Sequence, residues 1–258
     1  MSASTLVNQK AQPETVALFV SDLHLCAQMP KTAAAFFRFL EQEAASTRQL
    51  YLLGDVFEYW AGDDDLDDPF NRKLVDALRA LADKGISLYW MAGNRDFLVG
   101  EAFAQAAGVT LLSDPYIADI AGQRVLLLHG DAQCTDDKDY MAFRSQVRNA
   151  EWQRVFLARP LTERKALIEG MRAGSREAQR EKSMAIMDVN TEEIAKLFHA
   201  HEVKIMIHGH THRPATHRDQ HGVRHVLPDW DCEGQVVRGG WFAMDLEGHM
   251  HQRDLIDT

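Results

Sequence analysis

Seven side chains that can bind metal ions directly follow short apolar runs of this 258-residue chain. A short apolar run that ends in a glycine turn is typical of a buried strand. In an open α/β sheet the ligand crevice lies at the carboxyl ends of the strands, so we expect five strand ends to bring these side chains to one rim. They are two aspartates, one asparagine and four histidines: Asp22, His24, Asp55, Asn94, His129, His208 and His210.

This set of side chains suits a pair of hard divalent cations. Two ions roughly 3.5–4 Å apart need a bridging carboxylate and a mixture of oxygen and nitrogen ligands. Asp22 and His24 can point at one ion, and Asp55 is placed to bridge both. Asn94 would leave positive charge uncancelled for a substrate phosphate, because its amide is neutral. The pattern therefore predicts hydrolysis of a phosphate ester or anhydride.

The segments between the apolar runs are predicted to be helices. Apolar residues recur at three- and four-residue spacing from residue 32 to 46 and from 74 to 81. Strands that start roughly 30–40 residues apart and alternate with helices indicate successive βαβ units. Towards the C-terminus we expect antiparallel strands on a second sheet, at residues 223–226, 235–237 and 241–244.

The pattern changes between residues 136 and 182, where the sequence favours helices and no strand is predicted. Residues 138–182 hold eleven basic and six acidic side chains, although the whole chain carries a net charge of −10. We predict that 136–182 forms a helical lid inserted into one core, which comprises 16–135 and 183–258. The acidic run from 63 to 68 is expected to be a solvated loop.

Composition excludes several classes of function. The net charge of −10 gives no general attraction to nucleic acid. Three cysteines without CxxC spacing argue against a disulfide framework or a structural zinc finger and indicate a reducing, cytoplasmic setting. No apolar stretch approaches the ~18 residues of a transmembrane helix, so we expect membrane contact to be peripheral. No obligatory protein partner is evident.

The five blocks resemble the calcineurin-like metallophosphoesterases. The resemblance implies an α/β (α+β) fold, a four-layer αββα sandwich of two mixed sheets with an inserted helical lid, and two Mn²⁺ per chain. It also implies two ligand sets that share Asp55. One ion would take Asp22, His24, Asp55 and His210, and the other would take Asp55, Asn94, His129 and His208.

One position departs from the general family pattern. Arg95 stands where the family has histidine. A guanidinium cannot donate a proton at neutral pH, but it can clamp phosphate and offset developing charge. Arg95 therefore suits a substrate whose leaving group is already good, such as one phosphate of a pyrophosphate.

Longer stretches are similar to one branch, the UDP-2,3-diacylglucosamine pyrophosphohydrolases of lipid A biosynthesis. They include SDLHL at 21–25, GDVFEYW at 54–60 and HGHTHRP at 208–214. This resemblance implies cleavage of UDP-2,3-diacylglucosamine into UMP and 2,3-diacylglucosamine 1-phosphate (lipid X). A water activated by two metal ions would attack the phosphate nearer uridine, under a lid that covers the sugar and acyl chains.

The branch also implies the residues that would act. The catalytic residues would be Asp55, Asn94, Arg95, His129 and His208. Gln179 stands where the branch commonly has asparagine. The substrate contacts would be Asn94, Arg95, Asp137, Ser175, Gln179, Lys182 and His208.

The insertion mixes apolar and basic side chains, which suits acyl chains beside phosphates or a helix on an anionic membrane. An ordinary cap that packs its apolar face on the core is the simpler interpretation from periodicity, whereas the arginine count favours a membrane-facing role. We expect a peripheral enzyme on the cytoplasmic face of the inner membrane. The alternatives are a soluble metallophosphodiesterase acting on cyclic nucleotides or dinucleoside polyphosphates, and a non-catalytic scaffold, which the complete ligand set disfavours.

Overall fold

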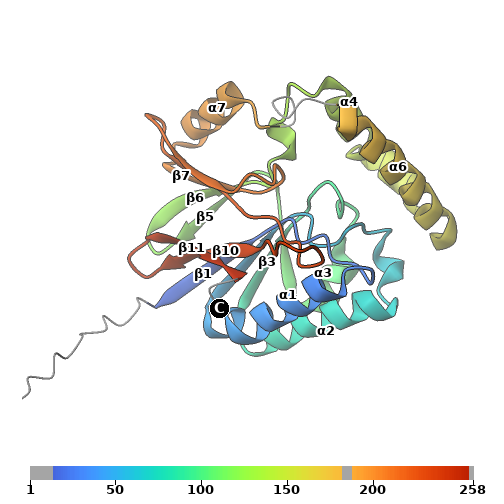
Figure 1. Ribbon diagram of the computed structural model, residues 1–258, viewed down its shortest axis with the longest axis horizontal. Helices are drawn as coiled ribbons and strands as arrows, with labels where there is room; N and C mark the ends of the chain where they lie inside the picture. Colours follow the sequence, from blue (N-terminus) through green and yellow to red (C-terminus); the bar gives the residue numbers. More distant parts are fainter. Residues whose placement is uncertain (1–13, 182–187, 256–258) are drawn as a thin grey trace, which may run out of the picture.

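Two mixed β-sheets lie face to face with helices on their outer sides (Figure 1). The computed structural model describes residues 14–181 and 188–255, without the side chains of 173–181. The strand order is β11-β10-β1-β2-β3-β4 in the first sheet and β5-β6-β7-β9-β8 in the second. The predicted α/β fold, a four-layer αββα sandwich, is confirmed.

The first sheet is built on four parallel strands. Neighbouring β10 pairs antiparallel with β1, and β11 pairs antiparallel with β10. Parallel strands covered on both faces are apolar along their whole length, which is why the runs near residues 17, 50 and 88 could be recognised as strands. The strands are β1 (Thr15–Val20), β2 (Gln49–Leu53), β3 (Ser87–Met91), β4 (Val109–Leu112), β10 (Gly240–Asp245) and β11 (Met250–Asp254).

The second sheet has a parallel centre and antiparallel edges. Strands β6, β7 and β9 are parallel, and the edge strands β5 and β8 pair antiparallel with β6 and β9. The sheet comprises β5 (Tyr116–Ile120), β6 (Gln123–Leu127), β7 (Ile205–His208), β8 (Ala215–Arg218) and β9 (Val223–Val226).

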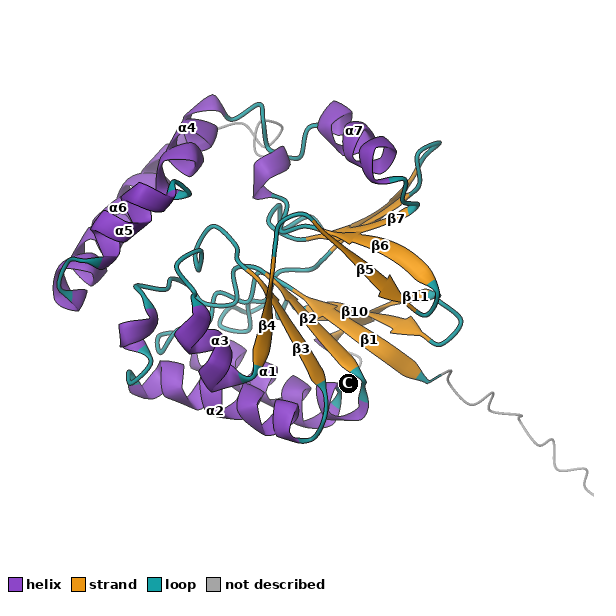
Figure 2. Cartoon of the chain, turned by 180° about the vertical axis from the view of Figure 1, so that it is seen from behind, coloured by secondary structure: helices purple, strands orange, loops and turns teal. Residues whose placement is uncertain are grey.

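Helices cover the outer face of each sheet, and a separate group lies to one side (Figure 2). Helices α1, α2 and α3 cover the first sheet, and α7 covers the second. Helices α4, α5 and α6 lie beside the sandwich. The helices are α1 (Pro30–Gln42), α2 (Pro69–Asp83), α3 (Glu101–Ala107), α4 (Lys138–Val147), α5 (Ala150–Leu157), α6 (Leu161–Glu181) and α7 (Thr191–His201).

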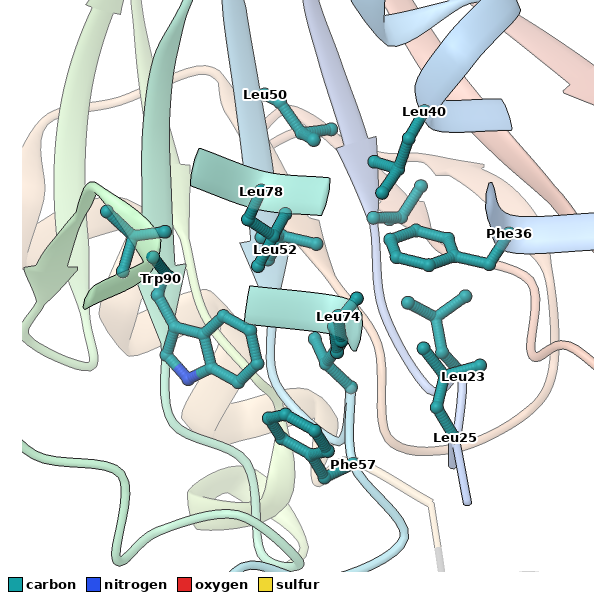
Figure 3. Close-up of a cluster of buried hydrophobic side chains, with 14 of the residues drawn as sticks. Leu23, Leu25, Phe36, Leu40, Leu50, Leu52, Phe57, Leu74, Leu78 and Trp90 are labelled. Carbon is teal, nitrogen blue, oxygen red and sulfur yellow. The ribbon is translucent and has the colours of Figure 1, made fainter. Parts of the chain in front are cut away.

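Three apolar clusters fill the spaces between the four layers. Alternating side chains of β1 divide between two of them: Phe19 packs between the sheets, while Leu18 faces the helices. The largest cluster packs β1–β3 against α1 and α2 and is shown in Figure 3. The third lies between the second sheet and α7. These cores hold the strand ends in fixed positions.

Two expectations for the chain after residue 200 were wrong. Residues 235–237 form a bend, held only by a bridge between Asp231 and Arg238. Strand β10 was expected on the second sheet but joins the first, where all six of its residues are buried. Neither outcome is visible in sequence periodicity, because strand partners are chosen by contacts between distant segments.

The acidic run at 63–68 is not a simple solvated loop, contrary to expectation. Asp63 accepts hydrogen bonds from the Trp60 indole and from two backbone amides. Asp65 is buried and lies 2.7 Å from Lys165 of α6. The run is therefore tied to α6.

Helices α4, α5 and α6 occupy the stretch predicted to be a lid, 136–182, of which Lys182 lies outside the described residues. The division of the chain into a core and a lid domain stays a prediction. Among the described helices, none is both long and apolar enough to cross a membrane.

Candidate metal centre

The backbone turns sharply where the strands end. Asp22, His24, Asp55 and His210 all have positive φ angles, between 49° and 68°. Such angles are uncommon for residues other than glycine, cost of order 1 kcal/mol or more, and concentrate at functional sites. Backbone hydrogen bonds hold the turns together, among them Asp22 N–H to Gly54 O at 3.1 Å. The turns bring side chains from separate strands to one point.

Two glycines allow these strand ends to approach one another. A Cβ atom on Gly93 would lie 2.2 Å from Asp55 Oδ1, and one on Gly54 would lie 2.3 Å from His129 Nδ1. Both distances are far below van der Waals contact. The glycine of the G-D and G-N blocks is therefore required by the close packing of the centre.

The structure assembles two groups of potential ligands, each with its ligand atoms within 4.8 Å of one another. Asp55 lies close to both groups, because its carboxylate is 3.7 Å from His129 Nε2 and 4.0 Å from His24 Nε2. One group comprises Asp22, His24 and His212, and the other comprises Asp55, His129 and His210.

Asn94 joins the second group. Its Oδ1 lies 3.0 Å from His129 Nε2, while His129 Nδ1 lies 3.0 Å from the carbonyl oxygen of Leu53. When Nδ1 donates its proton to Leu53, the Nε2 lone pair faces the oxygens of Asn94 and Asp55. Electron pairs that converge in this way are suited to a cation placed between them.

Asp22 gives a second sign that the centre fits a cation. Its Oδ2 accepts hydrogen bonds from Ser21 Oγ at 2.5 Å and from the His210 backbone at 2.8 Å. Its Oδ1 is buried and accepts no hydrogen bond from the described residues. The nearest side-chain nitrogen, His212 Nε2, lies 3.5 Å away. A buried carboxylate oxygen that accepts no hydrogen bond is costly, and a metal ion would satisfy it.

The pKa shifts of the histidines show that the carboxylates of the centre attract positive charge. Burial by itself lowers the pKa of His129, but the carboxylates of Asp55, Asp131 and Asp22 outweigh it and raise this pKa to about 9. Positive charge is therefore favoured at this point. Burial, with the charge on His129, lowers the pKa of His210 to about 4, so its imidazole is neutral at pH 7 and has a lone pair to offer.

His208 lies outside both groups. It is fully buried, and its Nε2 lies 2.9 Å from Arg224 Nη1. His212, which the sequence placed only next to the last block, lies 3.5 Å from Asp22 Oδ1 and 3.6 Å from Asp229 Oδ2. His210 groups with Asp55 and His129, whereas the resemblance placed it with Asp22 and His24. The seven ligands and their division between two ions stay a prediction.

A cavity of about 850 Å³ opens from the centre towards α4–α6. The predicted catalytic and substrate-binding residues Asn94, Arg95 and Asp137 line it, but His208 does not. Ser175 and Gln179 belong to α6, and their side chains lie outside the described residues, as does the whole of Lys182. On the lid side the wall is apolar and includes Phe143, Trp152, Phe156, Ile168 and Met171.

Two buried aspartates beside the centre were missed by sequence reasoning. Asp96 accepts backbone hydrogen bonds from Gly93 at 2.7 Å and Val56 at 2.9 Å, and so fixes the turns that carry the ligands. Asp131 accepts from Tyr140 of α4 at 2.7 Å and pairs with Arg144. Each follows a motif closely, in G-N-R-D and H-G-D, which was the only signal available.

Comparison with known proteins gives a consistent result. Residues 16–214 match the calcineurin-like phosphoesterase family. The UDP-2,3-diacylglucosamine hydrolase of Aromatoleum aromaticum is 50% identical over 228 residues, covering 86% of this chain and 92% of that protein. The protein of the same name in Escherichia coli O7:K1 is 47% identical over 225 residues, covering 86% and 93%.

A solved structure resembles the whole sandwich. A dimetal phosphatase from Danio rerio matches with a TM-score of 0.52 at 13% identity, covering 94% of this chain and 97% of that one. At this identity the likeness concerns the fold alone.

Proposed function

The chain belongs to the calcineurin-like phosphoesterase family, and we propose that it is a Mn²⁺-dependent UDP-2,3-diacylglucosamine diphosphatase. It hydrolyses the pyrophosphate bond to give UMP and 2,3-diacylglucosamine 1-phosphate. The names of relatives at 47–50% identity support this substrate. The observation that carries the proposal is the cavity itself, which joins clustered metal ligands to an apolar wall.

Two divalent ions would be held by the two groups of ligands around Asp55. When bound, they supply positive charge to phosphate oxygens and lower the pKa of water, which is the attacking nucleophile. The oxygen and nitrogen ligands, with no sulfur among them, support Mn²⁺, although Fe²⁺ and Zn²⁺ accept the same set.

Arg95 acts on the substrate phosphates. Its backbone N–H donates to Asp55 Oδ1 at 2.8 Å, and its side chain lines the cavity. Its buried Nε has no hydrogen-bond partner in the described part of the chain. The guanidinium is therefore available to clamp two phosphate oxygens and to offset charge in the transition state. Asn94 and Asp137 contact the substrate from the same cavity.

The apolar wall binds the acyl chains and excludes water from the reaction. Its side chains come from α4, α5 and α6, so the substrate lies between the lid and the strand ends. A small polar nucleotide has no apolar chains to bury against such a wall. This difference favours a lipid substrate over cyclic nucleotides or dinucleoside polyphosphates.

We also propose peripheral contact of the lid with an anionic membrane, on the cytoplasmic face of the inner membrane. Val155, Leu157 and Leu167 are 48%, 40% and 42% exposed. Arg154 and Arg159 lie on the same segment and are exposed as well. Apolar side chains beside arginines support binding at the level of lipid headgroups.

The test is UMP release from detergent-dispersed UDP-2,3-diacylglucosamine by metal-stripped protein, with and without Mn²⁺. We expect release only with Mn²⁺. Mn²⁺-dependent cleavage of a simple aryl phosphodiester without UMP release would contradict the lipid substrate while keeping the metal centre. Full activity after chelation would contradict the metal dependence.

A further inference from the structure

Glu58 lies between the metal centre and the lid. Its Oε2 is 3.0 Å from His24 Nδ1, and its Oε1 forms an ion pair with Arg172 Nη2 of α6. The side chains of Glu58, Arg172 and His24 are 19%, 20% and 15% exposed. Because water reaches them little, these contacts are screened much less than pairs on the surface.

His24 presents its two ring nitrogens to different partners. Its Nε2 faces the centre, 3.3 Å from His212 Nε2 and 4.0 Å from Asp55 Oδ2. Its Nδ1 faces Glu58. A carboxylate beside one nitrogen holds the proton there, fixes the ring and leaves the other lone pair for a metal ion.

Helix α6, which carries Arg172, is anchored to the loop after β2 that also contains Glu58. Arg164 of α6 is buried, donates to the Ala61 carbonyl and pairs with Asp64. Lys165 pairs with Asp65. The loop that contributes Asp55 to the centre therefore also holds the seat of α6, and Glu58 lies between the two.

We propose that Glu58 is a positioning residue that orients His24 for the metal ion and couples the seating of α6 to metal binding. This inference rests on the metal centre proposed above. Because Glu58 contacts both His24 and Arg172, metal binding favours the seated position of α6. The seated α6 favours metal binding by the same free energy. Glu58 itself does not contact the reacting atoms.

The first test measures Mn²⁺ binding to metal-stripped protein by calorimetry. We expect Glu58→Ala to weaken binding about 10- to 100-fold, the usual effect of losing a carboxylate behind a ligating histidine. Glu58→Gln should lose less affinity than Glu58→Ala, because its amide oxygen can face His24 Nδ1 as the carboxylate does. It should lose only the share that the ion pair with Arg172 contributes through the seated lid. Glu151→Ala is the control, since Glu151 lies on α5 and is 67% exposed in a pair with Arg154.

The second test follows the lid by hydrogen exchange over residues 161–172. Mn²⁺ should slow exchange there in the natural chain. Glu58→Gln and Arg172→Gln should each lose most of that protection, because a neutral amide cannot replace the ion pair. Arg154→Gln, which removes an exposed lid arginine, should keep it. A positioning role also predicts that Glu58→Gln keeps more Mn²⁺ affinity than Glu58→Ala, whereas general destabilisation predicts no such difference.

The outcomes distinguish a failure of the role of Glu58 from a failure of the proposed metal centre. Natural affinity and natural protection in Glu58→Ala would overturn the role of Glu58. If that variant does not fold, unchanged metal-dependent protection in the isosteric Glu58→Gln overturns the coupling. Absence of Mn²⁺ binding by the natural chain would instead overturn the proposed metal centre.

Discussion

Asp55 is the residue at which the two groups of potential ligands meet. Its carboxylate lies within 4.0 Å of both His24 and His129 and accepts a hydrogen bond from the Arg95 backbone. It is buried, so it influences each neighbour with little screening by water. Substitution at this residue should affect chemistry far more than folding.

We expect Asp55→Asn to lower Mn²⁺-dependent UMP release by at least ~100-fold, because a neutral amide is a poor bridge between two cations. Turnover and far-ultraviolet circular dichroism would be measured together. Asp119→Asn, at an exposed position of β5, is the control and should have natural activity. Natural turnover in Asp55→Asn would reject the bridging role.

A second prediction at this scale concerns Gly93. Gly93→Ala places a methyl group 2.2 Å from Asp55 Oδ1, so Asp55 must move and Mn²⁺ binding and turnover should fall sharply. Gly170→Ala is the matched control, because nothing lies within 4 Å of its added methyl. That control should stabilise α6 by about 0.5–1 kcal/mol. Calorimetric Mn²⁺ titration and thermal melts of both variants would check this, and unchanged binding in Gly93→Ala contradicts it.

At the scale of elements, the β10–β11 hairpin shows how one buried carboxylate closes a turn. Asp245 Oδ1 accepts from the backbone of Glu247 and His249, and Oδ2 lies 2.8 Å from His251 Nε2. Burial alone raises the pKa of Asp245, but these hydrogen bonds outweigh it and lower the pKa from 3.8 to about 2.

The depressed pKa predicts a pH dependence of stability. The unfolded chain binds the proton more readily, so the contribution of Asp245 is present above about pH 4 and is lost as pH falls towards 2. It amounts to about 2 kcal/mol at most. Urea unfolding at pH 5, 4 and 3 would measure the free energy of unfolding of Asp245→Asn and of the natural chain. The variant should be less stable at pH 5, and the difference between the two should shrink as the pH falls. A difference in stability that does not change with pH would contradict this role of Asp245. Asp119→Asn is the control and should unfold like the natural chain at each pH.

At the scale of the whole molecule, the metal centre lies where both sheets and the lid meet. Its potential ligands follow the ends of β1, β2, β3, β6 and β7. Ions that bind only this folded arrangement must stabilise the fold as a whole. Bound metal ions should therefore contribute to stability as well as to the proposed catalysis.

Metal removal should consequently lower the melting temperature. At a free Mn²⁺ concentration 100 times the dissociation constant, the folded state gains about 2.7 kcal/mol per site. Melts of stripped protein with and without Mn²⁺ would measure the shift, and Asp55→Asn should show little of it. A melting temperature that does not respond to Mn²⁺ in the natural chain would contradict the site.

Much of this protein can be predicted from the order of its residues. The apolar runs, the helices at 30–42 and 69–83 and the polar side chains at strand ends are local features. Burial on both faces makes each strand apolar throughout, and chain geometry ends it at a turn. The types of ligand and their sequence positions follow from the same local rules.

The tertiary structure alone decided which residues meet. His212 groups with Asp22 and His24, β10 joins the first sheet, and Glu58 contacts Arg172 across 114 positions of chain. Sequence patterns record whether a side chain is apolar and how often it recurs. Contacts between distant segments depend on how whole layers pack, and no local periodicity carries that information.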